Sequence, residues 1–97
     1  MNGTYSVTLQ TPFGIQRGTV TFVDNNGMLS GSIRTMGNTS FFRNGKINEN
    51  SFEFSGILNA GFLSLKYTTK GTTEGDTLKA VALTSSGTFQ INGTRVA

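Results

Sequence analysis

The chain contains no cysteine, no histidine and no tryptophan, and only one proline. Without cysteine it can form neither a disulfide framework nor a thiolate metal site. The absence of histidine as well removes the usual general base and the commonest transition-metal ligand, so an orthodox catalytic triad is excluded. A Tyr5 or Tyr67 phenol beside an arginine could polarise a carbonyl, but the spacing gives no support for it. We therefore expect a non-enzymatic protein that holds no cofactor and no metal.

Acidic residues are also few, and their positions do not suit catalysis or ion binding. Asp24, Glu49, Glu74 and Asp76 fall in expected turns, while Glu53 points outward because its two phenylalanine neighbours point inward. Paired-carboxylate catalysis needs two acids that face each other across a cleft. The segment 74–76 supplies two carboxylates, which is short of the roughly six or more oxygens that Ca²⁺ takes.

Long apolar runs are missing too. No segment approaches the roughly 18 apolar residues of a membrane helix. The first residues open directly into a strand pattern, without a basic segment or an apolar run of the signal-peptide type. We therefore expect a cytoplasmic protein with no membrane partner.

The formal net charge is +3, with 13% of the residues charged. The basic residues are scattered along the chain and form no run. The pattern also places no platform of exposed aromatics among them, as an RNA-binding sheet would require. We therefore expect the charge to serve solubility and expect no nucleic-acid partner.

What the sequence does contain is alternation of apolar and polar residues from end to end, with helical spacing nowhere sustained. Strands are expected around residues 4–10, 18–22, 29–33, 39–43, 46–48, 52–58, 63–67, 78–82 and 89–93. Asn26-Gly27 favours a hairpin, Asn44-Gly45 is expected to be a turn, and the polar run 70–76 is expected to be the longest loop.

Short strands joined by short loops leave no room for crossover helices, so each strand should pair antiparallel with the one before it. The prediction is an all-β fold, with residues 1–97 as a single domain. It is an antiparallel up-and-down meander of about eight strands closed into a small barrel, because closure removes the edge strands. An open sandwich of two sheets is the alternative.

The alternation also assigns side chains to the lumen of this barrel. The predicted lumen residues are Tyr5, Val20, Phe22, Ile33, Phe52, Phe54, Leu65, Tyr67, Phe89 and Ile91. Gly18, Gly31 and Gly56 share the inward phase, where they allow the strands to bend, and Ala80 and Ala82 add small residues. The interior of an eight-stranded barrel is either just filled by side chains or holds one small ligand.

Both ends of the chain carry a resemblance. Gly3-Thr4-Tyr5 and Gly93-Thr94-Arg95 resemble the closure signature of calycin-type barrels, the lipocalin, fatty-acid-binding and avidin relatives. This resemblance implies a calycin-like barrel closed by Arg95 lying on the ring of Tyr5. The chain is also similar to short bacterial barrel domains at Thr11 to Gly14, Leu29 to Ser32 and Gly75 to Leu78, which implies a fold but no settled activity. Avidin-type biotin sites are walled with tryptophan, which this chain lacks.

The opposite phase of the strands places apolar residues on the outside. Ile57, Val81 and Leu83 are expected to face outward, joined by Phe42 and Phe62 at turn edges. This is more apolar surface than a small monomer needs, and it predicts an interface unless the exposure is merely scattered.

Two functions follow from these patterns. The first is a non-enzymatic barrel that binds a small apolar or amphipathic ligand in its lumen. The second is a structural or accessory module with a filled lumen, which forms a homo-oligomer or docks on a partner protein through its outer apolar face.

Overall fold

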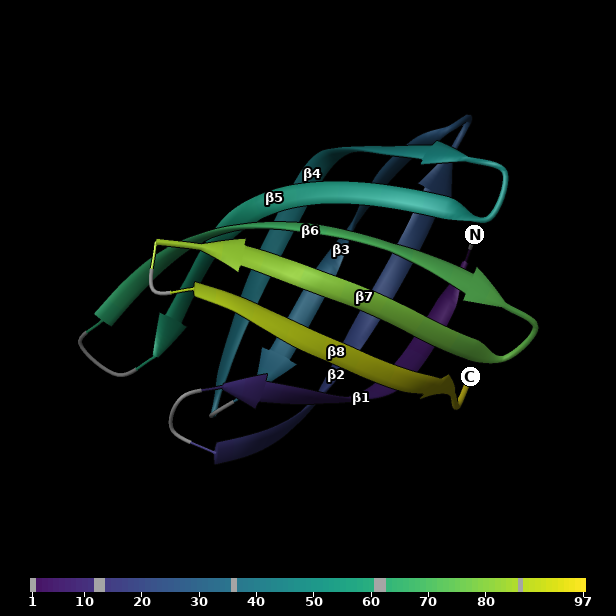
Figure 1. Cartoon of the computed structure of the whole chain (residues 1–97). Coiled ribbons are helices and arrows are strands. Elements are labelled where there is room, and N and C mark those ends of the chain that lie inside the picture. The colour runs from purple at the N-terminus through teal and green to yellow at the C-terminus, as the bar shows by residue number, and fades with distance from the viewer. Residues whose placement is uncertain (1, 12–13, 36, 61–62, 86) are drawn as a thin grey trace.

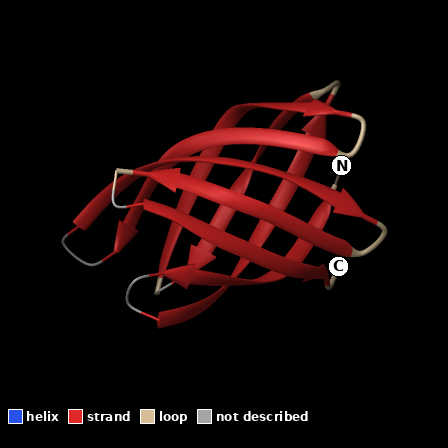
Figure 2. Ribbon diagram, in the orientation of Figure 1, coloured by secondary structure: helices blue, strands red, loops and turns tan. Residues whose placement is uncertain are grey.

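Eight antiparallel strands make up the computed structural model of the protein, which describes residues 2–11, 14–35, 37–60, 63–85 and 87–97. The strands are β1 (Gly3–Thr11), β2 (Gly14–Asn25), β3 (Met28–Thr35), β4 (Asn38–Asn48), β5 (Ser51–Ala60), β6 (Leu63–Glu74), β7 (Thr77–Thr84) and β8 (Gly87–Arg95). They pair in chain order and close into one barrel (Figure 1), with extents of 35 × 23 × 21 Å. The described part of the chain contains strands and loops and no helix (Figure 2), which confirms the predicted fold class.

The barrel closes where the first strand meets the last. β1 pairs antiparallel with β8, and Tyr5 stands opposite Arg95 in the register. Beyond the ladder, the Thr4 amide donates to the Ala97 carbonyl at 2.9 Å and the Val96 amide donates to the Thr4 carbonyl at 2.8 Å. These bonds use backbone groups that an open sheet would leave at its edges, which is the advantage of closure.

The hairpin predicted at Asn26-Gly27 is confirmed. Asn26 has a φ of 56° and Gly27 a φ of 86°, as a two-residue hairpin loop between β2 and β3 requires. The Asp24 carboxylate accepts a hydrogen bond from the Gly27 amide at 3.0 Å, which ties the turn to the strand before it. The turn predicted from Thr11 to Gly14 includes residues 12 and 13, which lie outside the described residues.

The turn predicted at Asn44-Gly45 is wrong, because β4 runs through it as one strand. The register between β3 and β4 instead shifts between Leu29 and Gly31. Leu29 pairs with Gly45 and Gly31 pairs with Phe42, so an advance of two residues along β3 corresponds to three residues along β4. Asn44 has a φ of 62°, a left-handed conformation that asparagine tolerates better than most residues. The segment is therefore a β-bulge, which adds one residue to the strand and reverses the side-chain phase after it.

The prediction that Phe42 faces outward is wrong. This side chain is 4% exposed and belongs to the core, whereas its neighbour Phe41 is 78% exposed on the outside. Alternation alone could not decide between two adjacent phenylalanines. The decision comes from the β3 ladder, which pairs Phe42 with Gly31 and so brings its ring to the inward side.

The long loop predicted over residues 70–76 is also wrong. β6 continues to Glu74 and pairs with β7 as far as Thr77, so the turn between them consists of Gly75 and Asp76. Threonine suits a strand with one solvated face, and polarity alone therefore did not mark a loop here.

Aromatic rings fill the centre of the barrel. The ring centroid of Phe22 lies 5.6 Å from that of Tyr5 and 5.1 Å from that of Phe52. The Phe42 and Phe54 rings are stacked, with centroids 3.9 Å apart and planes 13° apart. Each ring buries a large apolar area, so this cluster supplies much of the stability of a small domain.

Candidate functional site

The structure places the predicted lumen residues on the inside of the barrel. Eight of the ten are buried, namely Tyr5, Val20, Phe22, Ile33, Phe52, Phe54, Tyr67 and Ile91. The other two, Leu65 and Phe89, are half-buried and line one of the internal cavities. The prediction omitted further core residues, namely Val7, Leu9, Leu29 and Leu78, although their alternation with polar neighbours marked them. Phe42, which it placed outside, completes the core.

Side chains occupy almost all of this lumen. The described residues line two small cavities within the barrel, of about 20 Å³ and about 30 Å³. Val20, Phe22 and Phe52 are among the residues that line the first, and Leu65, Tyr67 and Phe89 are among those that line the second. A cavity of about 10–15 Å³ holds one water molecule, whereas sites for drug-sized ligands measure roughly 300–1,000 Å³. Each cavity therefore has room for about one or two water molecules.

Two hydroxyl groups in this core have no hydrogen-bond partner among the described residues. They belong to Tyr67 on β6 and to Ser40 on β4, and both residues are buried. Burial raises the pKa of the Tyr67 phenol to about 12, because the charged phenolate would lose its hydration there. Gly56 lies directly across the ladder from Tyr67, and a Cβ at Gly56 would stand 2.8 Å from the phenol oxygen. The missing side chain at Gly56 is what makes room for the ring.

The residues of the closure signature come together at one end of the barrel. A Cβ on Gly3 would stand 2.9 Å from Nε of Arg95, so the arginine side chain lies over this glycine. The same Nε donates to the Ala97 carbonyl at 3.2 Å. Tyr5 is buried two residues along β1, on the same side of the strand as Gly3. Stacking of the guanidinium on the Tyr5 ring stays a prediction.

One part of the outer surface, which we call the β5–β7 wall, carries the three apolar residues predicted to face outward. Ile57 is 49% exposed, Val81 36% and Leu83 43%. The wall consists of Glu53, Ser55 and Ile57 on β5, Lys66, Thr68 and Lys70 on β6, and Lys79, Val81 and Leu83 on β7. Phe62, predicted to join this group, lies outside the described residues.

The strand register sets each apolar residue of the wall beside a polar one. Ile57 stands opposite Lys66, Leu83 opposite Thr68, and Val81 opposite Lys70. Directly opposite residues in an antiparallel pair have Cβ atoms about 4.5–5.5 Å apart, so these side chains are neighbours. The wall therefore alternates apolar groups with ammonium or hydroxyl groups across its strands.

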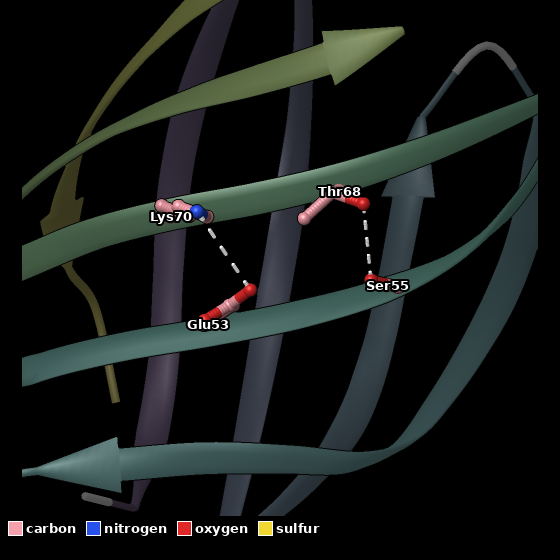
Figure 3. Close-up of polar contacts among 4 residues, drawn as sticks. All are labelled: Glu53, Ser55, Thr68 and Lys70. Carbon is pink, nitrogen blue, oxygen red and sulfur yellow. Dashed lines mark hydrogen bonds and ion pairs between the residues drawn. The ribbon is translucent and has the colours of Figure 1, made fainter.

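Figure 3 shows two polar rungs between β5 and β6 on this wall. Lys70 Nζ lies 4.0 Å from a carboxylate oxygen of Glu53, and the hydroxyl oxygens of Ser55 and Thr68 lie 3.1 Å apart. About half of each charged side chain is exposed, so the ion pair contributes roughly 0–1 kcal/mol and can exchange partners.

The wall is also hollowed. A shallow hollow of about 560 Å³ lies between Ile57 and Leu83, and Lys66 is the one charged residue among the described residues that line it. Its other lining includes the hydroxyl groups of Ser55 and Thr68. A second hollow, of about 340 Å³, adjoins Val81 on the same wall. These outer hollows are more than ten times larger than either internal cavity.

In the described part of the chain, no group of three or more acidic residues is placed so that it could hold a metal ion. The same residues include no helix that is long and apolar enough to cross a membrane.

The fold defines the class of the protein: an eight-stranded antiparallel up-and-down barrel, compatible with a calycin-like fold. No protein-family model matches the chain, and neither a curated protein nor a solved structure matches it.

Proposed function

We propose that the protein is a non-enzymatic accessory module that associates through its β5–β7 wall. The observation that carries this proposal is the contrast between the two surfaces of the sheet. Three apolar side chains on this wall, those of Ile57, Val81 and Leu83, are 36–49% exposed. Ile57 and Leu83 line a hollow of about 560 Å³, and Val81 lines the smaller hollow of about 340 Å³. The lumen, by contrast, is occupied by aromatic rings. Exposed apolar groups that gather in one place, with polar groups around them, are typical of protein interfaces.

Binding of a small apolar or amphipathic ligand in the lumen is the other function that the strand pattern predicts. Its support is the apolar lining, which would suit such a ligand. Cavities of about 20 and 30 Å³ are too small for it unless several rings move together. The geometry therefore favours the outer wall.

A calycin-type ancestry is part of the proposal. It is supported by the up-and-down order of the eight strands and by the meeting of Gly3 and Arg95 where β1 pairs with β8. Fold likeness of this kind carries no activity with it, because barrels of one architecture serve many functions.

The proposal is tested by comparing association in a variant of the β5–β7 wall with association in a variant of another part of the barrel's outer surface. Proximity labelling in the native cell, combined with analytical ultracentrifugation of the purified chain, reports partners and self-association together. We expect the variant Ile57→Asp/Leu83→Asp to lose the labelled partner or the oligomer. Ile15→Asp/Val23→Asp is the matched control, because Ile15 and Val23 are exposed on β2, four strands away from β6 around the barrel.

Equal loss in both variants, or no loss in either, contradicts the proposal. Both variants should keep the folded spectrum of the parent, because all four side chains are exposed and a charge there costs little stability.

A further inference from the structure

Lysine and apolar side chains are interleaved on the β5–β7 wall, and this interleaving restricts the chemistry of a partner. Lys66 stands opposite Ile57, and Lys70 stands opposite Val81. Lys66 forms no ion pair among the described residues, and the hollow beside it has no carboxylate among its described lining. Lys70 has one acidic partner among the described residues, Glu53, at 4.0 Å, and about half of each side chain is exposed to water.

A second copy of this chain is a poor occupant for the wall. A two-fold contact is isologous, so each residue near the axis meets its own counterpart or that of a neighbour. With the axis at Thr68, the centre of the wall on β6, Lys66 of one copy would face Lys70 of the other. Like charges placed opposite each other at a contact are unfavourable.

Nucleic acid suits the wall no better. Single-stranded nucleic acid is held by aromatic side chains on which bases stack, and phosphates are best matched by the planar arginine fork. The wall carries neither: its cations are lysines, and its exposed apolar groups are the aliphatic Ile57, Val81 and Leu83.

We propose that the β5–β7 wall docks on an acidic segment of a partner protein in which carboxylates alternate with apolar side chains. This inference rests on the proposed function and names the partner chemistry for the same wall. Partner carboxylates pair with Lys66 and Lys70, while partner apolar groups enter the hollow between Ile57 and Leu83. Glu53 competes for Lys70 in the free protein and turns away when the partner binds.

The experiment is a titration of the full ¹⁵N-labelled chain with a short peptide in which Glu and Leu alternate. We expect amide shifts on β5, β6 and β7 and none on β1 to β3. Lys66→Glu/Lys70→Glu should weaken binding at least tenfold, about 1.4 kcal/mol, and Glu53→Gln should strengthen it. Arg17→Glu/Arg34→Glu is the matched control: it makes the same charge change on β2 and β3 and should leave binding unchanged.

A peptide with Lys in place of Glu, vesicles of anionic lipid and a single-stranded oligonucleotide serve as the competing probes. Equal or tighter binding of any of these at the same amides overturns the inference, as does the absence of binding by the acidic peptide. If Ile57→Asp/Leu83→Asp abolishes native association while the lysine reversal leaves it intact, the acidic partner is wrong and the proposed function stands. A wild-type homodimer formed through this wall leads to the same conclusion. If native association survives in both the Ile57→Asp/Leu83→Asp variant and the lysine-reversal variant, both proposals are wrong.

Discussion

The phenol oxygen of Tyr67 lies 2.8 Å from the point where a Cβ on Gly56 would stand, and the three nearest atoms to that point all belong to the tyrosine. The two residues are directly opposite each other in the β5–β6 ladder. The inward face of β5 therefore gives up one side chain so that the large ring on β6 can lie flat across it. A ring covering a cross-strand glycine restores packing that the glycine alone would forgo.

Gly56→Ala should destabilise the barrel by about 1–3 kcal/mol, because the added methyl group meets the Tyr67 ring at less than van der Waals distance. Denaturant unfolding measures this loss. In a Tyr67→Leu background the same substitution should cost much less, since the atoms in its way are gone. Equal cost in both backgrounds would mean that the ring is not the obstacle.

Tyr67→Phe should leave stability unchanged or raise it by up to about 1 kcal/mol. The hydroxyl is buried without a partner among the described residues, so its removal relieves a desolvation cost and breaks no bond between them. Ser40→Ala tests the same reasoning at a second site, because the Ser40 hydroxyl is also buried without a hydrogen-bond partner among the described residues. A loss of more than about 1 kcal/mol in either variant would show that the hydroxyl is hydrogen-bonded in solution.

Alkaline pH should destabilise the protein through Tyr67. Burial raises the pKa of its phenol from 10.0 to about 12 in the folded state. The phenol ionises more easily in the unfolded chain, so the free energy of unfolding is unaffected below about pH 10 and falls as pH rises from about 10 through about 12. Urea unfolding on both sides of pH 10 should show a steeper decline for the parent than for Tyr67→Phe. Parallel declines would contradict the assignment.

Phe42→Ala and Phe41→Ala test the bulge in β4. The Phe42 ring is buried and stacked on Phe54, so its truncation should cost about 3–5 kcal/mol. Phe41 is 78% exposed, and its truncation should fall within about 0.5 kcal/mol of the parent. The reverse order would place the phase change elsewhere in the strand.

Much of the barrel was predictable because its side chains alternate. Tyr5, Val7 and Leu9 on β1 read as one inward face, and β7 reads the same way at Leu78, Ala80 and Ala82. The Asn26-Gly27 turn was predictable because few other dipeptides accept two positive φ angles. Strand phase and turn type depend mainly on residues close together in the chain, so they can be predicted from the sequence alone.

The errors arose where tertiary pairing overrides a local signal. Asn44-Gly45 has the composition of a turn, yet Gly45 pairs with Leu29 of β3 and the ladder with β5 begins at the next residue, Lys46, so the segment continues as one bulged strand. Lys70 to Glu74 has the composition of a loop, yet all five residues pair with β7 and those up to Thr72 pair with β5 as well. The filling of the lumen was equally out of reach, because it depends on how rings from several strands pack together.

The central claim is that apolar contact takes place on the β5–β7 wall and not in the lumen. Methyl NMR distinguishes the two directly, because Ile57, Val81 and Leu83 report on the wall while Val20, Ile33 and Ile91 report on the lumen. The measurement is a titration of methyl-labelled protein with a small soluble apolar probe. We predict shifts confined to the first three residues. Saturating shifts of Val20, Ile33 and Ile91, with the wall methyls unmoved, would contradict the account and restore the lumen as the binding site.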